Sequence, residues 1–208
     1  MTIRVGLNAG FGDPLAGEFA GIATHGFRVV RQDVYAHQST EDAAACVREF
    51  AGVPVTALFL IGGGSISHPN GNRLEPHELA PLVGLVVDTA AASGVTGYAI
   101  EIGNEPDIAC PGYASHPEDF AEAIRQCLEA ARAHQCPGPL ITGGIANLND
   151  RGFRYLSRML AAPSMPPDGV TIGFHRYPEA GRGPLAPHDR FHSRDDEWAR
   201  VGDEGDGH

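Results

Sequence analysis

Three acidic residues stand in or just after one of the most apolar runs of the chain. In "YAIEIGNEPDIACPGY", residues 98–113, Glu101 interrupts the apolar residues, and Glu105 and Asp107 follow them. A carboxylate in a core needs an opposite charge or hydrogen-bond donors, because burial otherwise is costly or keeps it protonated. Positioned carboxyl groups also serve as general acids and bases. The stretch therefore predicts an internal ion pair, a catalytic carboxyl group, or both.

Glu101 and Glu105 are four residues apart, so on a strand both would point to the same face. Arg31 and His175 stand in two other strand-like runs, and alternate strands of a barrel feed the same interior layers. We therefore expect Arg31, one of the two glutamates and His175 to meet. Glu101, the deeper residue, is expected to be a structural ion-pair member, and Glu105, at the strand end, the catalytic group.

Apolar runs rich in Val, Ile, Leu, Phe and Tyr alternate with helical patterns along the chain. We expect strands at 3–10, 27–34, 53–62, 97–103, 138–146 and 169–177, and helices at 14–24, 39–52, 75–94, 115–135 and 149–163. Ser115, three residues before Glu118, has the spacing of a capping box. Strict alternation of strand and helix predicts a parallel sheet with right-handed crossovers.

Two parallel architectures fit this alternation, an open doubly wound sheet and a (β/α)₈ barrel. "GLNAGFGDP" after the first strand does not give GxGxxG, and "LIGGGSIS" after the third lacks the lysine of a P-loop. We therefore expect the fold class α/β, of the (β/α)₈ TIM-barrel type, incomplete, with about six β/α units.

Polar side chains gather at the expected carboxyl ends of the strands, where barrel enzymes place their active sites. Besides the residues above, these are Asn8, Asp33, Ser65, His68, Asn104, Asn147 and Tyr177. A rim of this composition is typical of a binding mouth for a hydroxyl-rich ligand.

Three stretches resemble motifs of the clan A glycoside hydrolases, which are retaining (β/α)₈ enzymes. "EIGNEP" at 101–106 resembles their strand-four motif, "GFHRYP" at 173–178 their strand-six motif, and "GFRVVRQDV" at 26–34 their strand-two segment. The three stand on strands of matching rank and in the same order, and the resemblance covers residues 1 to about 180.

The resemblance implies a role for each matched residue. Glu105 would be the general acid/base, and Asn104 would hydrogen-bond the sugar 2-hydroxyl beside the scissile bond. Arg31 would support the nucleophile, and Tyr177 would orient it. His175 would line the subsite at the scissile sugar. His68, in the loop after the third strand, is a further candidate for contacting sugar hydroxyls.

The chain departs from the family's pattern after Tyr177. The family's nucleophile ends a seventh strand, and "PEAGRGPLAPHDRFHSRDDEWARVGDEGDGH" contains no apolar strand-like run. We expect residues 1–180 to form a partial glycosidase-like domain and residues 181–208 a partial helix and an acidic flexible tail. The chain thus resembles a truncated barrel, expected to hydrolyse glycosides poorly by itself and able to self-associate through open barrel edges.

The net charge and the residue types of the chain limit which partners and which chemistry it can have. The formal charge of -11 argues against a nucleic-acid binder, whose phosphate contacts need clustered Lys and Arg. All basic residues are arginines, so the chain performs no lysine chemistry. The four cysteines, Cys46, Cys110, Cys127 and Cys136, show no metal-ligand spacing and are expected to be reduced. No signal peptide and no membrane span are recognisable, so we expect a cytoplasmic protein if the first Met is the native start, and localisation stays open if the chain is a fragment. The resemblance implies a carbohydrate substrate, and we expect no cofactor or metal.

Two other functions stay open. One is a barrel isomerase or hydrolase that holds a divalent metal with His68, Glu105, Asp107 and His175, since ligands from different strands need no local spacing. The other is a non-catalytic sugar-binding pseudoenzyme, or a subunit that completes its barrel by association.

Overall fold

The structure is a computed structural model that describes residues 6–9, 24, 27–62, 66–108, 110, 112–146 and 149–175. These residues belong to one compact unit, which spans residues 1–175. Several predictions fall outside the described residues: the positions Ser65, Asn147 and Tyr177, the tail 181–208, and the helix at 14–24 except Thr24.

The strands form one parallel sheet whose spatial order follows the chain. They are β1 (Gly6–Ala9), β2 (Val29–Val34), β3 (Thr56–Ile61), β4 (Tyr98–Ile102), β5 (Leu140–Thr142) and β6 (Val170–Thr171), in the order β1-β2-β3-β4-β5-β6. A doubly wound sheet reverses its strand order at a switch point, and this sheet does not. The predicted fold class is confirmed: the chain is α/β, of the (β/α)₈ type and incomplete, and its described residues form six consecutive strands of the barrel.

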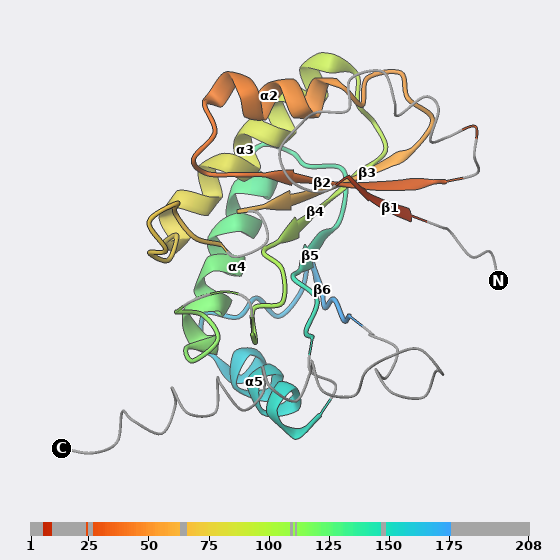
Figure 1. The fold of residues 1–208 in the computed structure, drawn as a ribbon. Coiled ribbons are helices and arrows are strands. Elements are labelled where there is room, and N and C mark those ends of the chain that lie inside the picture. Colours follow the sequence, from red (N-terminus) through yellow and green to blue (C-terminus); the bar gives the residue numbers. More distant parts are fainter. Residues whose placement is uncertain are drawn as a thin grey trace, which may run out of the picture. The chain divides into compact units, whose positions relative to one another are not determined.

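Each described helix connects two neighbouring strands. The helices are α2 (Thr40–Arg48), α3 (Pro76–Ser93), α4 (Pro117–Ala133) and α5 (Asp150–Ala161). They follow one another along the outer side of the row of strands (Figure 1). None of the helices that the structure describes is long and apolar enough to cross a membrane.

The main core lies between the sheet and the helices. The ring of Phe59 on β3 meets the edges of Phe50, which follows α2, and Tyr98 on β4, with centroids 5.3 and 5.8 Å apart. Val30 and Val34 on β2 are buried in the same cluster. Since successive strand residues point to opposite faces, Arg31 and Asp33 point away from this core, toward the barrel interior.

Helix starts show where the sequence pattern was right and where it was wrong. Ser39 caps α2 and accepts the amide of Asp42. The capping box at Ser115 is wrong: α4 begins at Pro117 after the N-cap His116, and Ser115 Oγ lies 2.9 Å from His116 Nδ1 instead. Because Pro117 fixes the first helical position, the cap falls one residue later than the serine.

Candidate functional site

The turn after β4 presents Glu105 in an unusual backbone conformation. Gly103 has φ +66° and Glu105 has φ +48°, both in the left-handed region. A side chain on Gly103 would clash with Ile66, so glycine is required there. A non-glycine residue at positive φ costs about 1–3 kcal/mol and persists only where its surroundings hold it. The chain therefore fixes the orientation of Glu105 at some energetic cost.

The Glu105 carboxyl group faces His175 from the end of β6. Its Oε1 lies 3.0 Å from His175 Nδ1, and Glu105 is 9% exposed. The carbonyl oxygen of Glu105 accepts the amide of Ile108, which closes the turn. Arg31, one glutamate and His175 were expected to meet at one place, and the structure divides them into two pairs: His175 contacts Glu105, while Arg31 contacts Glu101.

Glu101 and Arg31 form the second pair of the site. Arg31 Nε donates to Glu101 Oε2 at 2.7 Å and Arg31 Nη2 to Oε1 at 3.0 Å, a bidentate arrangement. Nη2 also donates to Asn104 Oδ1 at 2.9 Å. The predicted buried ion pair is thus present. Because its oxygen is occupied by Arg31, the side-chain amide of Asn104 offers its NH₂ group to a ligand.

A buried thiol, that of Cys110, hydrogen-bonds to the backbone of the turn after β4. The Cys110 thiol donates to the carbonyl oxygen of Asn104 at 3.0 Å. Burial raises the pKa of this thiol to about 12, so at neutral pH it keeps the proton that it donates. All four cysteines lie among the described residues and are free thiols, as predicted.

The other candidate residues have different surroundings. His68 Nε2 lies 3.2 Å from Glu78 Oε1 at the start of α3. The backbone amide of Glu75 donates to Glu78 and, with a smaller contribution from His68, lowers the pKa of that carboxyl group. Tyr113 is fully buried and donates its hydroxyl to the carbonyl oxygen of Leu74, so its ring does not face the rim.

Sequence reasoning missed Tyr35, which follows β2 at the same rim. Its hydroxyl donates to Asp33 Oδ2 at 2.8 Å, and the other oxygen of Asp33 is buried without a hydrogen-bond partner among the described residues. Burial, followed by the hydrogen bond and charge of Asp33, raises the pKa of Tyr35 well above its usual range. The spacing of two residues between Arg31, Asp33 and Tyr35 is the signal that could have indicated one shared face.

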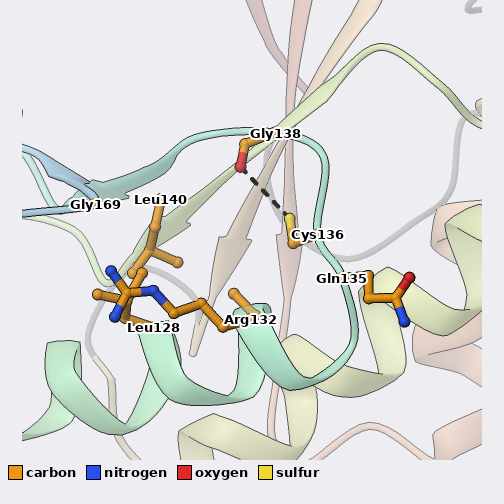
Figure 2. Close-up of a pocket in the computed structure, with 8 residues that line it drawn as sticks. Leu128, Arg132, Gln135, Cys136, Gly138, Leu140 and Gly169 are labelled. Carbon is orange, nitrogen blue, oxygen red and sulfur yellow. Dashed lines mark hydrogen bonds between the residues drawn. The ribbon is translucent and has the colours of Figure 1, made fainter.

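The described residues contain no group of three or more His, Cys, Asp and Glu side chains able to hold a metal ion. The alternative set of four ligands is divided: His68 contacts Glu78, while Glu105 contacts His175. The hollow in Figure 2, about 360 Å³, lies elsewhere, since Leu140 and Gly138 at the amino end of β5 line it. The candidate site lies at the carboxyl ends.

Comparison with solved structures shows the fold family of this arrangement. The chain is similar to the β-mannanase from Thermomonospora fusca (TM-score 0.57, 14% identity, 84% of this chain and 58% of that one). It is also similar to the mannohexaose complex of that enzyme (0.56, 14%, 84% and 60%) and to an endo-β1,6-glucanase (0.56, 10%, 85% and 53%). The chain spans a little over half the length of these structures. No protein-family model and no curated protein matches the sequence.

Proposed function

We propose that this chain carries the acid/base half of a clan A type glycoside-hydrolysing site. One observation carries the proposal: Arg31 on β2 contacts Asn104, and His175, which follows β6, contacts Glu105, so side chains from three different strands meet at the turn after β4. Barrel enzymes assemble their catalytic groups from the carboxyl ends of different strands in this way. The fold likeness to a β-mannanase and an endo-β1,6-glucanase supports the same assignment.

In the proposed reaction, Glu105 protonates the glycosidic oxygen of the leaving group and later takes a proton from the attacking water. Its nearly complete burial and its contact with His175 hold the carboxyl group in one orientation. The NH₂ group of Asn104 donates to the 2-hydroxyl of the sugar, a bond that strengthens in the transition state. Arg31 keeps that amide turned outward while it neutralises Glu101.

A retaining mechanism needs a second carboxylate about 5 Å from the first. Two carboxylates near the end of β4 are already engaged: Glu101 by Arg31, and Asp107 by the amide of Ala146. We therefore assign the nucleophile to neither of these two carboxylates. Tyr177 is its proposed orienting residue. Residues 1–208 alone are expected to bind saccharide and to turn it over slowly or not at all.

The proposed substrate is a β-linked glycan. The similar structures are named as enzymes of mannan and β1,6-glucan, and one holds mannohexaose. Mannohexaose and a β1,6-linked glucose hexamer are therefore the probes. Calorimetric titration of the purified chain is expected to give saturable binding of at least one, and binding is expected to survive Glu105→Gln because the amide keeps the shape of the side chain.

Catalysis is tested by supplying the second carboxylate. A chimera joins residues 1–180 to the last two β/α units of the Thermomonospora fusca β-mannanase, and release of reducing sugar is measured. Glu105→Gln is expected to lower hydrolysis by about 10²–10⁴-fold, the usual contribution of a general acid/base. Glu122→Gln, on the outward part of α4, is the matched control. Equal hydrolysis by the chimera and its Glu105→Gln variant would refute the assignment.

The sheet edges suggest how the chain associates. In the described sheet β6 pairs only with β5, and two large apolar side chains of α5, Phe153 and Leu160, are about half exposed. We propose self-association at these edges, as exposed strands and apolar patches favour it. Sedimentation is expected to show concentration-dependent dimers that Phe153→Glu weakens. A monomer at all concentrations would contradict this.

A further inference from the structure

We propose that Asp107 is a positioning residue that holds Glu105 and His175 in contact through the end of β5. The inference rests on the proposed function only in naming Glu105 as the group that needs this orientation. Its own evidence is a continuous path of hydrogen bonds from the turn after β4, across residues 143–146, to the end of β6.

The first part of the path is the Asp107 carboxyl group, which is 1% exposed. Its Oδ1 accepts the backbone amide of Ala146 at 2.9 Å. Asp107 belongs to the turn closed by the amide of Ile108 on the carbonyl oxygen of Glu105. A carboxylate accepting a buried amide forms a strong, directional bond. The left-handed backbone of Glu105 is therefore fixed two residues away by an anchor to the neighbouring strand.

The second part of the path leads from Ala146 to His175. The preceding residue, Ile145, donates its amide to the carbonyl oxygen of Gly173 at 3.1 Å and accepts the amide of His175 at 3.1 Å. The imidazole ring of His175 lies directly over Gly144, where a Cβ would clash with it. Residues 143–146 thus contact both the backbone and the imidazole ring of His175, and they also donate the amide that Asp107 accepts.

The two parts together make residues 143–146 a shared support for the two members of the Glu105–His175 pair. The side chains of the pair come from strands that do not neighbour each other, since β5 lies between β4 and β6. Their 3.0 Å contact depends on both being fixed to residues 143–146, which directly follow β5. Loss of the Asp107 bond frees one member while the other stays in place.

The tautomer of His175 reports this contact directly. When His175 is neutral and Glu105 is ionised, the carboxylate at Nδ1 requires the proton to be on Nδ1, because a carboxylate only accepts. The ¹⁵N shifts of the imidazole in the full chain measure the fraction of this tautomer without saccharide or turnover. This measurement is independent of the glycosidase assay. Asp107 can hold the Glu105–His175 contact even if Glu105 is not the acid/base, and Glu105 can be the acid/base even if Asp107 does not hold the contact.

Asp107→Asn keeps an acceptor oxygen for the Ala146 amide, and Asp107→Leu keeps the volume without an acceptor. The Nδ1–H tautomer is expected to dominate in the unmodified chain and in Asp107→Asn, and to fall by about half or more in Asp107→Leu. Val86→Ala, a cavity in the fully buried part of α3, controls for lost stability and is expected to keep the tautomer. A folded Asp107→Leu variant with the tautomer unchanged, or an Asp107→Asn variant that loses it, would overturn the proposal.

Hydrogen exchange supplies a second measurement if Asp107→Leu does not fold. The Ala146 amide is expected to be protected in the unmodified chain and in Asp107→Asn, as are the neighbouring amides of Ile145 and His175. Exchange of Ala146 at the rate of an unfolded peptide, beside a protected Ile145, would show that Asp107 does not hold it.

Discussion

The pair of Arg31 and Glu101 gives the sharpest test of how the barrel interior is held together. The side chains are 17% and 6% exposed, and two hydrogen bonds join them. Breaking a buried pair by removing one partner leaves an uncompensated charge and costs about 3–5 kcal/mol. Replacing both partners by apolar residues of similar volume is much less harmful, because no buried charge remains.

The perturbation is a double-mutant cycle of Arg31→Met, Glu101→Leu and the double variant. Each single variant is expected to lose about 4 kcal/mol of unfolding free energy. At an m-value of about 2 kcal/mol/M, this moves the urea midpoint by about 2 M. In the double variant Asn104 still loses its Arg31 donor, so we expect a residual loss of about 1–3 kcal/mol.

The assay is urea unfolding followed by circular dichroism, with the coupling energy taken from the four variants. A coupling of about 3 kcal/mol or more is expected. The matched control is the pair of Arg132 and Asp168, whose side chains are 59% and 81% exposed. Its cycle, with Arg132→Met and Asp168→Ala, should give about 0–1 kcal/mol. Additive effects at Arg31 and Glu101 would refute the buried pair.

Three further predictions concern glycine, tyrosine and glutamate positions. Gly138→Ala should lower the unfolding free energy by about 2 kcal/mol or more, because the new Cβ would clash with the carbonyl oxygen of Tyr98. In the control Gly97→Ala, the new Cβ would meet only Val55 O at 4.0 Å, so the unfolding free energy should change little. Equal urea midpoints of the two variants would contradict this. Tyr113→Phe should cost about 1–2 kcal/mol by leaving the carbonyl oxygen of Leu74 unpaired. Tyr155→Phe removes a buried hydroxyl that has no partner among the described residues, so it should be neutral or stabilising, and thermal unfolding of both variants tests the contrast. Hydrogen bonds from Arg125, then Gln126, lower the pKa of Glu122 from 4.5 to about 2. The contribution of Glu122 to the unfolding free energy is therefore present above pH 4.5 and lost as the pH falls toward 2. Urea unfolding across this range should show a smaller loss of unfolding free energy on acidification in Glu122→Gln, and an unchanged pH dependence would refute the shift.

The fold was predictable because its signals are local. Apolar runs and helical periodicity reveal strand and helix from a few neighbouring residues, and their strict alternation implies parallel pairing. The lack of a phosphate-binding fingerprint then favoured a barrel over a doubly wound sheet. The lengths of the last strands were not predictable: β5 and β6 cover only Leu140–Thr142 and Val170–Thr171, where longer runs were expected. A strand ends where the backbone of the neighbouring strand no longer offers hydrogen-bond partners, and no local sequence pattern indicates that position.

The pairing of charges was partly predictable, because burial leaves a carboxylate few options. Glu101 among isoleucines required a cation, and Arg31 on an alternate strand could supply it. The sequence did not indicate that Arg31 would also reach Asn104, or that Tyr35 would contact Asp33. Those contacts depend on side-chain reach between strand ends.

By itself, the sequence determined the order of the elements, their parallel alternation, and the presence of acids at the end of an apolar strand. Those properties follow from side-chain type and short-range spacing. Only the tertiary structure decided that His175 contacts Glu105 rather than Glu101, that His68 contacts Glu78 at α3, and that Asp107 reaches the amide of Ala146. Each of these contacts joins different elements, and its geometry is fixed by the register of strands and by a left-handed turn at Glu105 that the residue's own preference disfavours.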